Sequence, residues 1–189
     1  DVYKRQGHVQ DLLMHLALSH PEVALQFLNN GQEKLRTSGN GKLKDVIYQI
    51  YGRDVAANLI ELDYEKGGLR ITGFLGKPVI TRGNRNFENF FVNGRYVKSG
   101  MISKALEDAY RDFVMQHKFP FAVLHFHLNG EEVDINVHPT KMELRFQKQQ
   151  EVYGTVFEAV HRTLLEPELI QRAEVPEPVA VRMEEENAG

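Results

Sequence analysis

The spacing of apolar residues predicts helices near both ends of the chain and mainly strands between them. A first helix is expected from about residue 9 up to Pro21, because its apolar residues recur at helical spacing. The same spacing predicts helices over 43–51, over 103–113 with Ser103 as the cap, and over 153–164.

The segments between these helices carry alternating or short apolar runs separated by turn signals. Three Asn-Gly pairs, at 30–31, 93–94 and 129–130, mark expected hairpins, and a fourth turn is expected over Glu65–Gly68. The expected strands are 23–28, 34–36, 55–62, 69–75, 87–92, 95–97, 121–128, 132–137 and 143–146. Helices and strands in this order predict an α+β fold with a mixed sheet and packed helices.

Turn-rich and polar stretches divide the chain into units. Residues 1–6 show no apolar pattern, and we interpret them as a sequence that is foreign to the protein, a scar, and leave them out of the fold prediction. The chain does not begin with Met and looks truncated at its start. The Ser-Gly-Asn-Gly stretch beginning at Ser38 separates a short unit, 7–38, from a larger domain, 39–165. Residues 166–189 contain three prolines and mostly acidic or small residues, so we expect a disordered linker there.

Composition excludes several classes of protein. The chain has no cysteine, which removes disulfides, thiolate metal sites and cysteine nucleophiles. No apolar run approaches the ~20 residues that cross a bilayer, and the first residues do not resemble a signal peptide. We therefore expect a cytoplasmic protein without a membrane partner.

The charge is unevenly distributed, although its total is only −3. Residues from Glu166 onward carry a net −5, whereas residues 1–165 carry +2. The stretch from Arg82 to Lys104 has a local net charge of +4. This pattern argues against bulk coating of nucleic acid but allows a modest basic patch.

Two stretches could carry chemistry. In the first, Asp134-Ile-Asn-Val-His-Pro-Thr-Lys141, Pro139 is expected to end a strand and to leave Lys141 in a loop, where its ammonium could reach an anion on a neighbouring surface. In the second, the Asn93-Gly94 hairpin presents Arg95 and Lys98, which could contact phosphates. The alternative readings are an ordinary solvated lysine and a hairpin kept soluble by charge.

Other candidates are less specific. His125 and His127 share one face of a strand and could share a metal with Asp134 or His138, but no metal motif supports this over structural roles. The chain lacks a glycine-rich phosphate loop, a Gly-x-Ser-x-Gly motif and a histidine–carboxylate metal signature. If the chain takes part in catalysis, we therefore expect it to contribute one residue to an active site that is built mainly by another part of the protein.

The two stretches together resemble the MutL family of DNA mismatch-repair proteins. The matching residues are Phe91-Val-Asn-Gly-Arg95 and Asp134-Ile-Asn-Val-His-Pro-Thr-Lys141, with weaker likeness in Thr81–Arg85 and Leu16–Glu22. The likeness covers about residues 7–165. It implies that 7–38 is the C-terminal remnant of a GHKL-type ATPase domain. It also implies that 39–165 is the transducer domain, which has the fold of ribosomal protein S5 domain 2.

The resemblance implies roles for three residues. Lys141 would contact the γ-phosphate of ATP, as the only catalytic and cofactor-binding residue here, and Arg95 and Lys98 would face DNA. Gly100 stands where some members have a further basic residue, which weakens the DNA assignment. No metal ligand is expected.

ATP and Mg²⁺ would be bound mainly by the absent part of the ATPase domain, so this fragment should be inactive alone. Implied partners are DNA, a second copy through ATP-dependent dimerisation, and a MutS-type mismatch-recognition protein. The alternative is a stand-alone S5-like module that binds nucleic acid without nucleotide chemistry.

Overall fold

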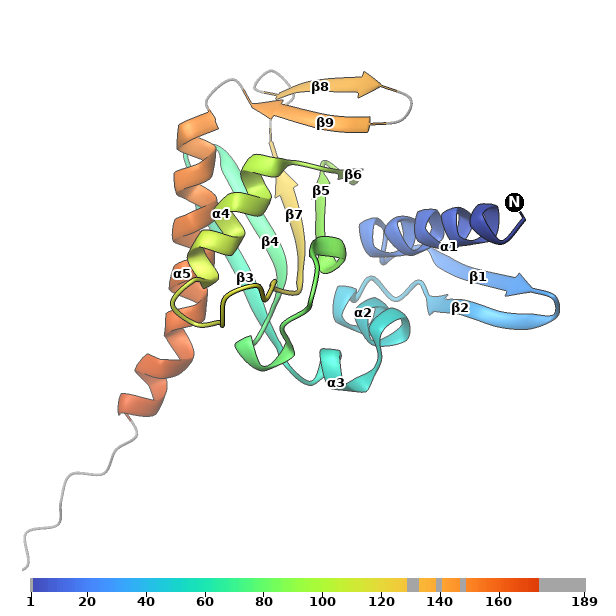
Figure 1. Cartoon of the computed structure of the whole chain (residues 1–189), viewed down its shortest axis with the longest axis horizontal. Helices are drawn as coiled ribbons and strands as arrows, with labels where there is room; N and C mark the ends of the chain where they lie inside the picture. Colours follow the sequence, from blue (N-terminus) through green and yellow to red (C-terminus); the bar gives the residue numbers. More distant parts are fainter. Residues whose placement is uncertain (1, 129–132, 139–140, 147–148, 174–189) are drawn as a thin grey trace, which may run out of the picture.

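The computed structural model describes residues 2–128, 133–138, 141–146 and 149–173, and the side chains of residues 4–128 and 149–166. Figure 1 shows an α1–β1–β2 unit beside a sheet that carries α4 and α5. The helices are α1 (Val2–Ser19), α2 (Leu43–Tyr51), α3 (Arg53–Ala56), α4 (Gly100–Tyr110) and α5 (Gln149–Ala173), with 3-10 turns η1 (Pro78–Ile80) and η2 (Arg85–Phe87). The strands are β1 (Ala24–Asn29), β2 (Gln32–Ser38), β3 (Leu59–Lys66), β4 (Leu69–Gly76), β5 (Glu88–Val92), β6 (Arg95–Val97), β7 (Ala122–His127), β8 (Val133–His138) and β9 (Lys141–Phe146).

The central sheet is mixed and has the strand order β3-β4-β7-β5-β6. Neighbouring strands are antiparallel except β5 and β7, which run parallel. The pairs β1–β2 and β8–β9 form separate antiparallel hairpins. Strands and helices thus share one body, and the predicted α+β class with a mixed sheet is confirmed.

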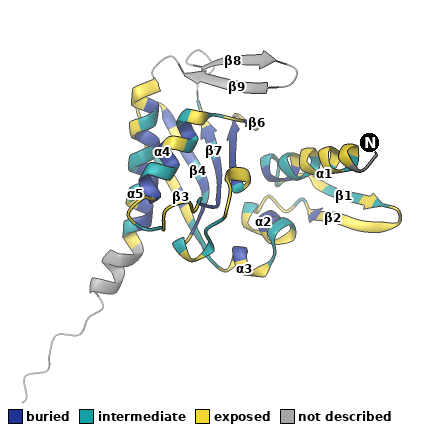
Figure 2. Ribbon diagram, in the orientation of Figure 1, coloured by how far each residue is buried: buried dark blue, intermediate teal, exposed yellow. Residues whose placement is uncertain are grey.

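Alternation along the central strands builds two apolar cores, one on each face of the sheet (Figure 2). On β5, Phe90 and Val92 pack toward α4 and α5, whereas Phe91 faces α1 and α2. On β7, Leu124 and Phe126 belong to the first core and Val123 to the second. Both faces of the sheet are covered, which explains why every residue of β5 is buried.

Strand β4 requires a glycine where it pairs with β7. Gly73 has a φ of 134°, and a Cβ built there would lie 2.0 Å from the carbonyl oxygen of Val123. Only glycine fits this backbone geometry, so the sequence of β4 is fixed at that point by its neighbour.

Most predicted elements are found, but several boundaries differ. Residues 53–56 form the short helix α3, where a strand was expected from residue 55. The cap of α4 is Ser99, whose Oγ accepts a hydrogen bond from the amide of Ile102 at 3.2 Å, and not Ser103. Starting the helix after Ser99 lengthens its buried face by one turn, because Ile102 joins the core.

The two ends of the chain also differ from expectation. Helix α1 begins at Val2, so residues 2–6, which were set aside as a scar, continue it. Helix α5 runs to Ala173, past the boundary expected at Glu166, so a proline in its sequence does not end it there. Residues 174–189 lie outside the described part. None of the described helices combines the length and apolar character that a membrane span requires.

Candidate nucleic-acid interface

The β5–β6 hairpin holds the two basic residues that the sequence selected. Its turn residues Asn93 and Gly94 have positive φ values of 46° and 82°, as a type I′ turn requires. The Asn93 side chain donates to the Leu128 carbonyl at 3.1 Å and accepts from the Leu128 amide at 3.2 Å. The Asn93 amide also donates to the Phe126 carbonyl at 3.0 Å. The turn is therefore anchored to β7 and is not a free loop.

Arg95 lies on the last strand of the sheet, and Lys98 follows that strand directly. Strand β6 ends the sheet order, and both side chains are exposed. Within the described part of the chain, neither forms an ion pair. Their charges are thus not neutralised by any described carboxylate, and both can approach an external anion.

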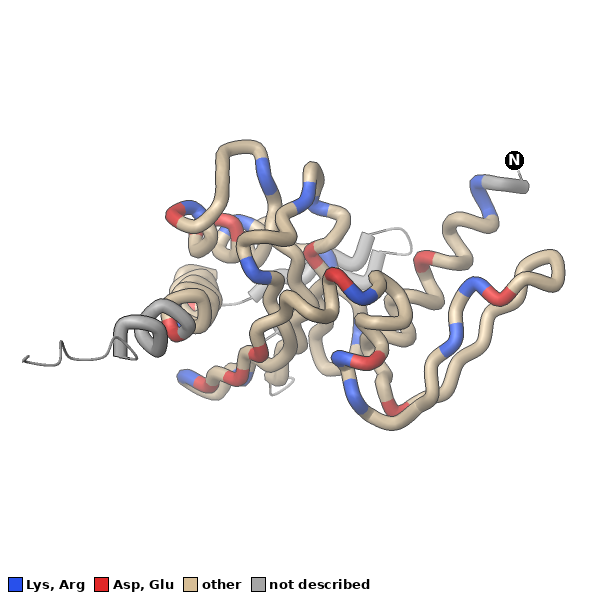
Figure 3. Tube along the Cα trace, turned by 90° about the horizontal axis from the view of Figure 1, so that it is seen from below, with Lys and Arg blue, Asp and Glu red and all other residues tan. Residues whose placement is uncertain are grey.

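The other basic residues of the predicted patch are engaged locally. Arg85 pairs with Glu107 at 2.8 Å, and Lys104 pairs with Asp108 at 3.3 Å. Arg82 lies over the Phe87 ring at 4.7 Å, and its Nε is buried without a hydrogen-bond partner. Along the trace, positive and negative residues are interspersed (Figure 3). The +4 stretch therefore leaves its free charge mainly at Arg95 and Lys98.

Helix α1 contacts the hairpin from one side of the sheet. The His15 ring stacks on the Tyr96 ring, with centroids 3.7 Å apart and planes 9° from parallel. Burial lowers the pKa of His15, and the nearby Lys98 lowers it further, whereas Asp11 raises it. The sequence alone assigns no role to His15 or Tyr96, because no local pattern pairs residues that are 81 positions apart.

The two histidines considered as metal ligands have other partners. His125 donates through Nε2 to the Leu18 carbonyl at 3.0 Å, which ties β7 to the last turn of α1. The Nε2 of His127 lies 3.1 Å from the Thr72 hydroxyl. Burial lowers the pKa of His125 and favours its neutral form. The described residues contain no group of three or more histidine or acidic side chains that could hold a metal.

Lys141 is the first residue of β9, paired in register with His138. The loop position predicted for it is therefore wrong, since the strand starts two residues earlier than expected. The side chains of Lys141, Asp134 and His138 lie outside the described residues, so the γ-phosphate contact stays a prediction.

Glu88 is a buried acid that the sequence analysis missed. It lies on the face of β5 that packs toward α4, and both carboxyl oxygens are buried without a hydrogen-bond partner. Burial raises the pKa of Glu88 to about 8, the charge of Glu107 adds to this, and the nearby Ser103 and Arg85 oppose it. The one charged position in the apolar run 87–92 was the available signal.

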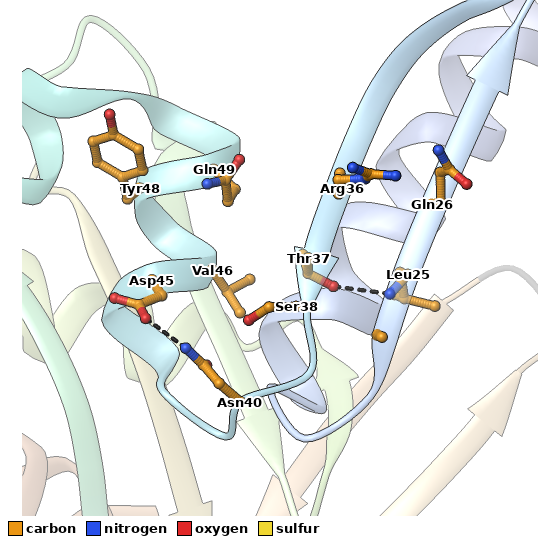
Figure 4. A pocket seen from close by; sticks show the side chains of 11 residues that line it. Leu25, Gln26, Arg36, Thr37, Ser38, Asn40, Asp45, Val46, Tyr48 and Gln49 are labelled. Atoms are coloured by element: carbon orange, nitrogen blue, oxygen red, sulfur yellow. Dashed lines mark hydrogen bonds between the residues drawn. The ribbon is translucent and has the colours of Figure 1, made fainter.

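A cavity of about 590 Å³ lies where the N-terminal hairpin meets α2 (Figure 4). Arg36 and Gln26 line it from β2 and β1, and Tyr48 and Gln49 line it from α2. The connection between the two walls includes Gly39 and Gly41, both with positive φ. The cavity therefore spans the boundary that the Ser-Gly-Asn-Gly stretch predicts between the two units.

Known proteins with similar sequence identify the family. The family described as "DNA mismatch repair protein, C-terminal domain" matches residues 47–165. The MutL protein of Agathobacter rectalis is 51% identical over 90% of this chain, and that of Streptococcus pneumoniae strain G54 is 39% identical over 88%. The chain spans about a quarter of the length of these relatives, 26% in each case.

Solved structures show the same fold at low sequence identity. The N-terminal domain of a DNA repair protein has a TM-score of 0.73 and 18% identity, covering 89% of this chain and 56% of that one. The ADP complex of the Aquifex aeolicus MutL ATPase domain has a TM-score of 0.50 and 18% identity, covering 81% of this chain and 48% of that one. From the family match over residues 47–165, the chain belongs to the MutL family of DNA mismatch-repair proteins.

Proposed function

We propose that this chain couples ATP binding and hydrolysis to DNA engagement and dimerisation in a MutL-type repair mediator. Residues 7–38 would be the end of the ATPase domain and residues 39–165 the transducer. The A. aeolicus neighbour is an ATPase domain complexed with ADP, and its fold extends over most of this chain, which supports the assignment. A second copy and a MutS-type protein are the proposed partners.

One observation carries the DNA-binding part of the proposal. Arg95 and Lys98 are exposed on an edge strand, next to a turn anchored by Asn93, and lack partners among the described side chains. A hairpin whose turn is anchored to β7 can present two cations to phosphates at a low cost in loop ordering. A contact to the phosphates would be independent of base sequence, because the backbone itself carries no sequence information.

The ATP-binding part concerns Lys141. When bound in the whole protein, ATP with Mg²⁺ would supply the phosphoryl group whose hydrolysis drives the cycle. The described side chains offer no acidic or histidine cluster for a cation, so Mg²⁺ would be held outside them. A lysine ammonium is suited to a phosphate as a compact positive charge. Lys141 would stabilise charge on the γ-phosphate and so distinguish ATP from ADP.

DNA binding by the 189-residue chain tests the first part. Fluorescence anisotropy with a labelled duplex of mixed sequence would be measured over a salt series. Arg95→Ala and Lys98→Ala should each weaken binding and lower the salt slope by about 1, because each removes one phosphate contact. Lys44→Ala, at an exposed position of α2, is the matched control. Affinities and slopes equal to those of the unaltered chain would refute the interface.

The second candidate is an S5-like module that binds nucleic acid without nucleotide chemistry. It is favoured by the same exposed pair, Arg95 and Lys98, and gives Lys141 no role. An effect of Lys141→Ala on ATP turnover in the whole protein therefore separates the two candidates.

A further inference from the structure

The basic hairpin is held on one side by very little backbone pairing. Strand β6 has three residues, pairs with β5 in the register Phe90–Val97, Phe91–Tyr96 and Val92–Arg95, and ends the five-stranded sheet. A short edge strand of this kind opens easily, since few hydrogen bonds must break. Contacts from outside the sheet therefore add to the anchored turn in holding Arg95 in place.

Helix α1 supplies such a contact through His15. The stack on Tyr96 places the imidazole against the middle residue of β6, directly after Arg95 and two residues before Lys98. Tyr96 also touches Phe91, with ring centroids 5.8 Å apart, so the stack continues into the second core. The two rings are half-buried, and a pair of aromatic side chains in contact contributes about 0.5–1.5 kcal/mol beyond the area that it buries.

Helix α1 is itself fixed to the sheet, so its contact with Tyr96 can hold β6 in one position. Ala17 and Leu18 are fully buried in the second core, and the Leu18 carbonyl accepts from His125 of β7. The His20 ring lies close to the hairpin turn, since a Cβ on Gly94 would be 3.3 Å from His20 Cε1. Helix α1 thus contacts the hairpin at β6 through His15, and His20, the residue directly after the helix, lies at the turn.

Two charged residues next to the His15–Tyr96 stack also connect α1 with the basic hairpin. Asp11 of α1 and Lys98 both act on His15, in opposite directions, and both line a cavity of about 690 Å³ that Tyr96 also lines. Asp11 lies one helical turn before His15, so the helix presents the ring and the carboxylate on the same side. A shift of α1 would change the surroundings of Lys98 together with the stack.

We propose that His15 is a positioning residue for the basic hairpin, through which α1 sets how Arg95 and Lys98 meet a nucleic-acid backbone. The inference rests on the proposed function in one respect, that this hairpin contacts DNA. It goes further by assigning the regulation of that contact to α1, which belongs to the proposed ATPase unit.

DNA affinity of the 189-residue chain tests the proposal with three variants. His15→Ala should weaken binding of a labelled mixed-sequence duplex by on the order of three- to tenfold, the equivalent of one aromatic stack. His15→Phe keeps a flat ring and should bind about as tightly as the unaltered chain. His8→Ala, exposed on the same helix, is the control and should change nothing.

The salt dependence separates positioning from contact. His15→Ala should leave the slope of log affinity against log salt unchanged, because it removes no phosphate contact, whereas Lys98→Ala lowers the slope by about 1. Full affinity in His15→Ala, or an equal loss in His15→Phe, would overturn the proposal. If Arg95→Ala and Lys98→Ala change nothing, the proposed DNA contact fails instead.

Hydrogen exchange without DNA tests the positioning independently of that contact. The amides of Arg95–Val97 should exchange on the order of three- to tenfold faster in His15→Ala and return to normal in His15→Phe, while β4 amides stay protected. Unchanged exchange in β6 would overturn the role of His15 even where DNA binding is lost. Far-UV circular dichroism confirms that each variant is folded.

Discussion

Replacing Glu88 with glutamine should destabilise the chain at low pH and stabilise it at high pH. The folded protein holds the pKa of this carboxyl at about 8, against 4.5 for the free side chain. A raised acid pKa means that the folded state binds the proton more tightly than the unfolded state. The free energy of unfolding contributed by Glu88 is therefore fully present below about pH 4.5 and declines until about pH 8.

The magnitude follows from the size of the shift. Each pH unit between about 5 and 8 should lower the free energy of unfolding of the unaltered chain by about 1.4 kcal/mol through this group. Glu88→Gln does not titrate, so its advantage should grow by about 4 kcal/mol from pH 5 to pH 8. The buried amide of glutamine finds no better partners and costs about 1–3 kcal/mol. The variant should be less stable at pH 5 and more stable at pH 8.

Urea unfolding followed by far-UV circular dichroism at pH 5, 6, 7 and 8 provides the assay, with the midpoint and slope fitted separately. Glu61→Gln, at an exposed position of β3, is the control and should not reproduce the pH-dependent difference. A stability difference between Glu88→Gln and the unaltered chain that is the same at all four pH values would refute the reasoning. It would show that the carboxyl is ionised in the folded state, with a partner.

Further predictions follow from single contacts and are checked by the same urea titration at neutral pH. Gly73→Ala should cost more than about 3 kcal/mol or prevent folding, because its Cβ would meet the Val123 carbonyl; stability close to normal would contradict the close approach of β4 and β7. Ser99→Ala should cost about 1 kcal/mol as a lost helix cap, and Ser103→Ala should cost less if Ser99 is the cap. Tyr110→Phe should cost about 1–2 kcal/mol, since it removes the 2.6 Å hydrogen bond to the buried Gly76 carbonyl; no change would show that the bond contributes little.

The sequence predicts best where local chemistry decides the structure. Asn93-Gly94 adopts the positive φ angles that its residue types favour, and Asn30-Gly31 does the same between β1 and β2. Helix α2 ends at Tyr51 as predicted, and it is followed by Gly52, whose φ of 89° suits glycine. These features depend on a few neighbouring residues, so a single sequence contains the information.

Features set by tertiary contacts were missed. The choice of Ser99 over Ser103 as the cap depends on whether Ile102 can be buried, which local spacing does not reveal. The basic stretch loses most of its free charge because Glu107 and Asp108 of α4 lie beside Arg85 and Lys104. The stack of His15 on Tyr96 likewise requires the fold to bring distant segments together.

For the candidate site, the sequence chose residues but could not give their surroundings. Arg95 and Lys98 are exposed as predicted, and their lack of described partners came only from the structure. Lys141 was expected in a loop, but it is the first residue of β9. The prediction was wrong because the proline at 139 was expected to delay the next strand until residue 143. Its proposed role depends on the family resemblance and on a contact outside the described side chains.

ATP turnover tests the central claim most directly. The chain would replace the matching segment of the A. rectalis MutL protein, which is 51% identical to it, and turnover would be compared for unaltered, Lys141→Ala and Lys98→Ala forms without DNA. The account predicts a loss of on the order of tens- to a thousand-fold in Lys141→Ala, because one charged stabiliser of the transferred phosphoryl group is removed, and no loss in Lys98→Ala. Equal turnover in Lys141→Ala and the unaltered form would contradict the account and favour a module without nucleotide chemistry.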